Sequence, residues 1–363
     1  NCILLAFIGS NPLFVKLGIN NLLAFAIILN KIFIFLQYTI QVVYLQALMN
    51  MELNTFILLF SGLVVLIIGG NLLLKSAVSI SLKFKIPKIL IGMTVVSLAT
   101  SAPELIISLK SALKGSSDLA ISNVVGSNIA NLGLVLGLTI LLSPIKISKN
   151  IYKIDWPIMM FSAIYFFIII LDGLISFFEG CVLVSFLIIT IIYLIKHQEK
   201  NEEDMDLGIE SVDSLSKSII LLILGGIFLY LGSEWFISGA IDLADFFGIS
   251  ERIIGVTVVS IGTSIPELVT SMVAVIKKEK SISIGNLLGS NIFNVFAVLG
   301  ITSIVTPLIV SDMNIINFDI YVMLFFAAII FPLIFIPKRF VLGRLEGVVI
   351  LSFYSYYIVN LFA

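Results

Sequence analysis

Two glutamates, Glu104 and Glu267, each follow a proline directly within a long apolar stretch. An ionised carboxylate at the centre of a bilayer costs about 2.5–3.5 kcal/mol to insert, so an acid in such a position indicates a functional site. Pro103 and Pro266 strengthen this interpretation, because a proline has no backbone N–H and leaves the carbonyl four residues earlier without its helical partner. At membrane depth, that carbonyl must be satisfied by protein, water or an ion.

Hydroxyl and amide side chains accompany each glutamate at matching spacings. Thr100 and Thr263 lie four residues before their glutamates, which would place hydroxyl and carboxylate on one side of a helix. Hard cations such as Ca²⁺ take about six to eight oxygen ligands of these kinds. The further candidate ligands are Ser101, Ser127 and Asn131 with the first glutamate, and Ser264, Ser290 and Asn294 with the second.

Helix packing is the alternative explanation for part of this set. Serine and asparagine are common where membrane helices approach closely and hydrogen-bond to one another. That alternative stays open for Ser127, Asn128, Ser290 and Asn291. It does not explain the two glutamates, because packing gives no reason to bury two unpaired acids.

The two glutamates belong to an internal duplication. Residues 91–137 and 254–300 align without a gap, and 23 of the 47 positions are identical. Glu267 lies 163 positions after Glu104, and Asn294 lies the same distance after Asn131. A fixed offset of this kind indicates two copies of one structural unit.

The composition places the chain in a membrane. Of its 363 residues 60% are hydrophobic and 12% charged, whereas soluble domains carry about 25% charged residues. An apolar run of roughly 18 residues or more is long enough to span the hydrocarbon core. After residue 51 we expect ten such spans, near 55–74, 88–110, 119–142, 154–171, 176–196, 217–240, 253–276, 282–307, 316–336 and 341–361.

The same composition excludes several classes of protein and site. A net charge of -1 without a long basic stripe argues against a nucleic-acid partner. Cys2, Cys181 and His197 are the only cysteines and histidine, too few for a disulfide framework or for a zinc or haem site. We therefore expect oxygen ligands for any metal ion, no cofactor, no enzymatic activity and no obligate protein partner.

The distribution of basic residues predicts an inverted repeat. Lysine and arginine concentrate in alternate loops, at 75–88, 146–153, 196–217, 277–280 and 338–344. Basic loops face the cytoplasm, so both ends of the ten-span unit are predicted outside and the central linker inside. Five spans separate each motif from its copy, and an odd number reverses the orientation. Inverted repeats with interrupted helices at the midplane are typical of secondary transporters.

The chain divides into four predicted segments. Residues 51–196 and 217–363 are the two inverted five-helix repeats of an all-α membrane protein, and residues 197–216 form an acidic cytoplasmic linker between them. Residues 1–50 have no counterpart in the repeat. For them an extension of the protein, an extra hydrophobic segment and a signal sequence all stay open.

The repeated motifs resemble those of the sodium/calcium exchanger family, within the cation/calcium antiporter superfamily. They read ATSAPE with GSNIAN and GTSIPE with GSNIFN, and the absence of a large domain between the halves fits a prokaryotic-type member. The resemblance implies ten helices in two inverted halves, with the first and sixth spans sliding against the rest. It also implies an ion site made by the glutamates and the candidate ligands above, with backbone carbonyls of Ser97 and Ser260.

The resemblance implies that Na⁺ entry drives Ca²⁺ extrusion by alternating access. One departure concerns Asn294, where some relatives have aspartate, so this site has two carboxylates only. A Ca²⁺/H⁺ antiporter on the same fold is the first alternative, because glutamates can carry protons. A cation channel is the second, and uncoupled flux would reveal it.

Overall fold

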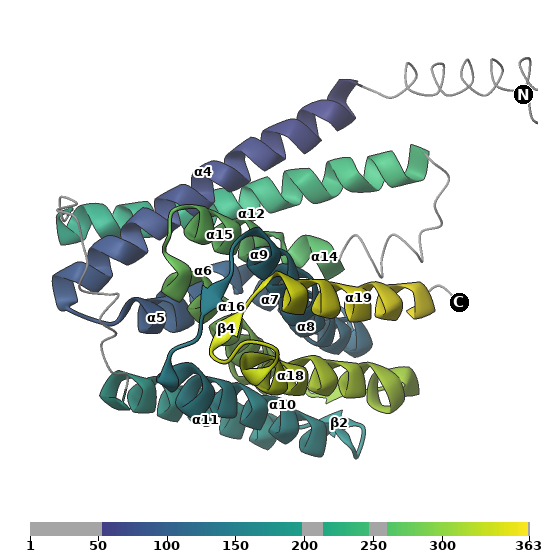
Figure 1. Ribbon diagram of the computed structural model, residues 1–363. Helices are drawn as coiled ribbons and strands as arrows, with labels where there is room; N and C mark the ends of the chain where they lie inside the picture. Colours follow the sequence, from purple (N-terminus) through teal and green to yellow (C-terminus); the bar gives the residue numbers. More distant parts are fainter. Residues whose placement is uncertain (1–52, 198–212, 247–259, 362–363) are drawn as a thin grey trace, which may run out of the picture. The chain divides into compact units, whose positions relative to one another are not determined.

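The computed structural model describes residues 53–197, 213–246 and 260–361, which form helices almost throughout (Figure 1). The expected segment 1–50 and most of the expected linker lie outside the described residues. The first half contains α4 (Leu53–Phe84), α5 (Lys88–Ile91), η1 (Gly92–Val96), α6 (Ser97–Thr100), α7 (Ala102–Leu113), α8 (Ser117–Ala130), η2 (Asn131–Val135), α9 (Leu136–Leu142), β1 (Ile145–Lys146), η3 (Ile151–Asp155), α10 (Trp156–Ile170), β2 (Leu174–Ile175) and α11 (Phe177–His197).

The second half repeats this order of elements. It contains α12 (Leu215–Phe246), α14 (Ser260–Thr263), α15 (Ile265–Ile276), α16 (Lys280–Phe293), η6 (Asn294–Leu299), α17 (Gly300–Val305), β3 (Leu308–Ile309), η7 (Ile315–Asp319), α18 (Ile320–Phe335), β4 (Val341–Leu342) and α19 (Arg344–Leu361). Here η denotes a π-helical turn.

The described residues contain seven helices long and apolar enough to cross a membrane, or eight when a bent pair counts as one span. The prediction of a multi-pass, all-α membrane protein is confirmed. Residues 253–259 of the seventh expected span lie outside the described part, and the tenth begins later than expected, at Arg344, because β4 precedes it. The total of ten spans stays a prediction.

The two copies of the motif run in opposite directions. Lys280, at the start of α16, donates from Nζ to the carbonyl of Pro144, just beyond the end of α9, at 2.7 Å. At the other end, the backbone N–H of Ser311 donates to Oδ1 of Asp118, near the start of α8, at 2.8 Å. Each segment therefore begins where its copy ends, which is the arrangement of an inverted repeat.

Two short sheets tie loops of one half to loops of the other. The pair β1–β4 joins Ile145 to Leu342, and the pair β2–β3 joins Leu174 to Ile309, both antiparallel. Strands β1 and β3 occupy equivalent positions, 163 residues apart. Because the repeats are inverted, these equivalent strands close opposite ends of the helix bundle.

The motif helices occupy the interior. The apolar 18-residue stretch of the span Ser117–Leu142 is 78% buried, and that of Lys280–Val305 is 83% buried. The corresponding stretch of Phe177–His197 is only 17% buried. Serine and asparagine need hydrogen-bond partners that lipid does not supply, so helices rich in them are covered by others. Highly apolar helices such as α11 can expose their side chains to lipid.

Both glutamate-bearing helices are interrupted just before the proline. The chain leaves helical geometry at Ser101, with φ −85° and ψ 4°, and at Ser264, with φ −86° and ψ 2°. The helices on either side of Ser101 differ in direction by 42°. Thr100 and Glu104 therefore lie on either side of a helix break, and the expectation that they face the same side stays a prediction.

The long helices α4 and α12 pack closely at glycines. A Cβ atom added to Gly62 would lie 2.7 Å from the backbone nitrogen of Phe236, and one added to Gly225 would lie 2.8 Å from that of Leu73. Only glycine allows this approach, as in other closely packed membrane helices.

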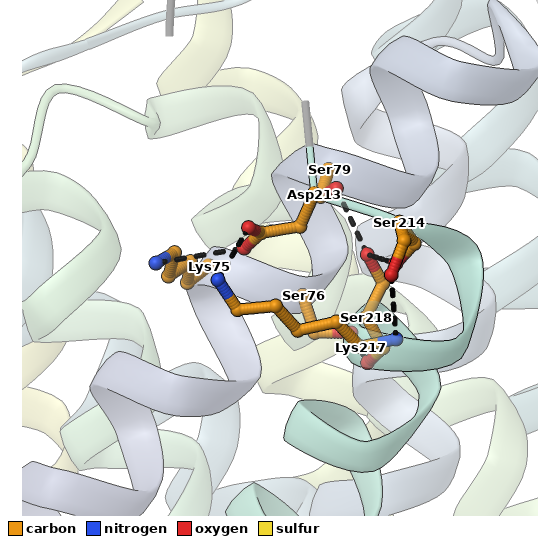
Figure 2. A network of polar contacts seen from close by, with 7 residues as sticks. All are labelled: Lys75, Ser76, Ser79, Asp213, Ser214, Lys217 and Ser218. Atoms are coloured by element: carbon orange, nitrogen blue, oxygen red, sulfur yellow. Dashed lines mark hydrogen bonds and ion pairs between the residues drawn. The ribbon is translucent and has the colours of Figure 1, made fainter. Parts of the chain in front are cut away.

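A polar network joins one end of α4 to the start of α12 (Figure 2). Ser76 donates to the carbonyl of Ser218 at 2.6 Å, and the hydroxyl of Ser218 donates to Ser79 at 2.9 Å. Asp213 accepts from Lys217 at 2.7 Å and pairs with Lys75 at 3.5 Å. The hydrogen bond from Lys217 holds the pKa of Asp213 below its ordinary value, so this carboxylate is ionised at neutral pH.

Candidate cation-binding site

Glu104 and Glu267 are fully buried at equivalent places in the two repeats. Each stands in the first turn of the helix that follows the break, α7 or α15, with its proline beside it. The N-terminus of a helix carries a partial positive charge and unpaired N–H groups, which stabilise a nearby carboxylate. The break thus allows an acid to be held in the interior of a membrane protein.

One hydroxyl from each repeat contacts the carboxylate of Glu267. Ser101 donates to Oε1 of Glu267 at 3.3 Å, and Ser290 donates to the same oxygen at 3.3 Å. The hydroxyls of Thr100 and Ser290 lie 3.3 Å apart. The sequence predicted two half-sites, each with its own glutamate and hydroxyls, whereas the structure shows hydroxyls crossing between the halves.

The other candidate ligands also meet across the repeats. The hydroxyls of Ser127 and Thr263 lie 3.0 Å apart. Asn294 donates from its amide to Oδ1 of Asn128 at 3.1 Å, and Asn128 in turn donates to the carbonyl of Asn291. Residues from the breaks and from the paired helices α8 and α16 therefore come together in one polar interior.

Several oxygens of this interior have no hydrogen-bond partner within the described structure. An unsatisfied polar group in an apolar interior is costly, and most such groups in proteins are paired. Six of these buried oxygens belong to candidate ligands: Oε1 and Oε2 of Glu104, Oε2 of Glu267, Oδ1 of Asn131, Oγ of Ser264 and Oδ1 of Asn294.

This donor set fits a hard cation. All six atoms are oxygens, and two carboxylates supply the charge that Ca²⁺ or Na⁺ requires. Within the described ranges no group of three or more histidine, cysteine, aspartate or glutamate side chains is placed to hold a metal. Two carboxylates and several neutral oxygens are ligands of the kinds that a hard cation takes.

The structure gives hydrogen bonds for one of the two backbone carbonyls expected from the resemblance, that of Ser97. The carbonyl of Ser97 accepts from the N–H of Ser101 at 2.8 Å and from the hydroxyl of Thr100 at 3.3 Å. Ser260 begins α14, and its side chain lies outside the described part. The freed carbonyl of Gly262 accepts from Ser233 of α12 at 2.9 Å, a contact that the sequence did not predict.

Two buried asparagines that contact the motif were not predicted as site residues. Asn286 accepts from Thr100 at 3.1 Å, and Asn123 donates to the carbonyl of Glu104 at 3.3 Å. Asn123 also donates to Ser108 at 3.0 Å. The signal was present, because the two asparagines lie 163 positions apart at the start of the repeated NVVGSN and NLLGSN segments.

Comparisons with known proteins agree with the geometry. Residues 54–196 and 217–363 match the family model described as sodium/calcium exchanger protein. The sodium/calcium exchanger MaX1 of Methanosarcina acetivorans is 34% identical over 356 residues, covering 85% of this chain and 98% of that protein. The inner membrane protein YrbG of Escherichia coli is 34% identical over 264 residues, covering 69% of this chain and 79% of that protein.

The fold has a solved counterpart. A structure of the sodium-calcium exchanger NCX_Mj, soaked with Na⁺ and Sr²⁺, superposes with a TM-score of 0.73 at 29% identity. The similarity covers 85% of this chain and 99% of that one. With a family model that matches both halves and relatives similar over most of its length, the chain belongs to the sodium/calcium exchanger family.

Proposed function

We propose that this protein exchanges Na⁺ for Ca²⁺ across a membrane through the site between its two repeats. Its main support is the pair of fully buried glutamates, with six ligand oxygens around the motif that have no hydrogen-bond partner among the described residues. Family membership supports the same substrates. The proposed ligands are Glu104 and Glu267 with the following residues: Thr100, Ser101, Ser127, Asn131, Thr263, Ser264, Ser290 and Asn294, and the carbonyls of Ser97 and Ser260.

The exchange follows from competition for these ligands. One Ca²⁺, or several Na⁺, would neutralise the two carboxylates in turn. An empty site with two negative charges would have to cross a region of low dielectric uncompensated, which is strongly unfavourable. Only the loaded site therefore changes sides, and alternating access couples the two fluxes. Inward Na⁺ flow would then expel Ca²⁺, without a cofactor or enzymatic step.

The membrane arrangement is part of the proposal. The segments 51–196 and 217–363 form the two five-helix halves, joined by the acidic linker 197–216 on the cytoplasmic side. Both ends of the ten-helix unit then face outside, as the alternating basic loops indicate. Bilayer lipid and the two ions are the only partners that this function requires.

Tracer flux tests the proposal. The protein is reconstituted into vesicles loaded with Na⁺, and uptake of ⁴⁵Ca²⁺ is followed after dilution into Na⁺-free buffer. We expect uptake at least about tenfold above protein-free vesicles, abolished when Na⁺ is equal on both sides. Uptake driven by a pH gradient instead would establish the Ca²⁺/H⁺ alternative, and flux indifferent to both gradients would contradict antiport.

A further inference from the structure

Equivalent residues in the two repeats make different hydrogen bonds. Thr100 donates to Oδ1 of Asn286 at 3.1 Å. Shifting both positions by 163 residues exchanges the repeats, and the equivalent pair is Thr263 with Asn123. That equivalent bond is not formed in the described structure: Oδ1 of Asn123 is buried without a partner, and Thr263 contacts Ser127 at 3.0 Å.

The glutamates show the same difference. Oε1 of Glu267 accepts from Ser101 and Ser290. The equivalent donors for Glu104 are Ser264 and Ser127, yet both carboxylate oxygens of Glu104 lack a partner in the described structure. Ser264 likewise has an unpartnered hydroxyl.

The paired helices continue the pattern. Asn294 donates to Oδ1 of Asn128 at 3.1 Å. The equivalent bond would run from Asn131 to Asn291, but both polar atoms of the Asn131 amide lack a partner in the described structure. Three sets of equivalent positions thus differ in the same sense, with bonds formed on the Glu267 side and missing on the Glu104 side.

Identical residues allow both arrangements. Each bond present on one side could be made on the other, because the repeated motifs supply the same donors and acceptors there. Because the repeats are inverted, exchanging the two sets of hydrogen bonds between them would move the bonded side to the opposite side of the membrane. Where both arrangements are populated, a change in either bond shifts their ratio.

We propose that Asn286 and Asn123 are positioning residues that form a reciprocal latch. In the state described here, Asn286 holds Thr100 and the latch on the other side is open. In the opposite state, Asn123 would hold Thr263 and release of Thr100 would open the first side. The proposal rests on the alternating access of the proposed function, and neither asparagine needs to contact an ion.

The two asparagines lie deep enough for such a role. Asn286 is fully buried and Asn123 is 4% exposed. Water therefore does not replace the hydrogen bond that a threonine hydroxyl loses when Oδ1 is removed. Each also donates from its amide to a serine of its own repeat: Asn286 to Ser271 at 3.4 Å and Asn123 to Ser108 at 3.0 Å. These local bonds anchor the side chain while Oδ1 engages or releases the threonine.

The latch predicts opposite effects of equivalent substitutions. Asn286→Ala removes a bond that only the present state makes, whereas Asn123→Ala removes one that only the opposite state makes. A typical net hydrogen bond corresponds to about a fivefold change in the population ratio. Hydrogen exchange of the amides of residues 88–100, in nanodiscs with enough Na⁺ to load the proposed site, would report the ratio of the two states, because these helices pack directly on α16 at Gly285 and Gly289.

We expect exchange in this segment to change by roughly fivefold in one direction for Asn286→Ala and in the other for Asn123→Ala. The double variant should return toward the wild-type value. Ser271→Ala and Ser108→Ala are matched controls, which remove the anchor partner but leave Oδ1 in place, and they should shift exchange far less.

Shifts in the same direction for both asparagines, or no shift in either folded variant, would overturn the latch. The measurement needs no ion flux, so its result is independent of the tracer experiment. A wild-type protein without Na⁺-dependent Ca²⁺ uptake would contradict the proposed function even where the opposite shifts are observed.

Discussion

The variants Glu104→Gln and Glu267→Gln should each weaken Ca²⁺ binding by about 100-fold or more, because the charge and number of ligands set Ca²⁺ affinity over several decades. Glutamine is close to glutamate in size, so the change removes charge with little change in volume. Equilibrium binding of ⁴⁵Ca²⁺ to the purified protein measures the loss. The same variants should show no Na⁺-dependent Ca²⁺ uptake in vesicles.

Glu346→Gln is the matched control. Glu346 is also buried, at 3% exposed, but its carboxylate accepts from the N–H of Gly343 at 2.9 Å and belongs to the start of α19. Glutamine can still accept that bond through its amide oxygen. Binding should therefore be near the wild-type value. Equal losses in all three variants would mean that removing any buried acid disturbs the fold.

The second large effect concerns neighbouring glycines on α12. Gly225→Ala should destabilise the protein by about 1–3 kcal/mol, because overpacking a tight contact forces the backbones apart. The added Cβ would lie 2.8 Å from the backbone nitrogen of Leu73 and 3.0 Å from the carbonyl of Gly69 on α4. The melting temperature in detergent measures the loss, and transport should fall with it.

Gly226→Ala tests whether the contact itself matters. In this adjacent position the nearest atom to an added Cβ is the side chain of Ala99, at 4.0 Å. Both substitutions change helix propensity equally, so Gly226→Ala should leave the melting temperature unchanged or slightly raised. A similar loss in both variants would contradict the close approach of α4 and α12.

Much of this architecture could be predicted because the chain contains its motif twice. The copies located the glutamates, the prolines beside them and the candidate ligands, and the odd number of spans between them predicted the inverted orientation. The contact of Lys280 with Pro144 and that of Ser311 with Asp118 show this orientation directly. Apolar length alone located most of the helices.

The details of the site could not be predicted from the duplication. Spacing along one helix placed Thr100 with Glu104 but did not predict its contacts with Asn286 and Ser290 of the other repeat. Which repeat donates to which carboxylate depends on how the halves pack. The bonding residues are the same in both copies, so unequal hydrogen bonds could not be predicted, and the difference between Asn286 and Asn123 appears only in three dimensions.

Local backbone geometry is a further example. The π-helical turns η2 and η6 begin at Asn131 and Asn294, both candidate ligands. Such turns recur at functional sites, because they interrupt the regular hydrogen bonding of the helix. Hydrophobic periodicity does not distinguish a π turn from the surrounding α-helix. The pattern therefore predicts each span as one continuous α-helix.

If both repeats contribute to one ion site, a bound ion must lie between them, and its position can be seen directly. Crystals of the protein soaked with Ca²⁺ or Sr²⁺ would show the ion as a peak in anomalous difference maps. We expect a peak between Glu104 and Glu267, with Ca²⁺ about 2.3–2.6 Å from carboxylate oxygens of both. A peak coordinated by one repeat alone, or one away from both glutamates, would contradict it.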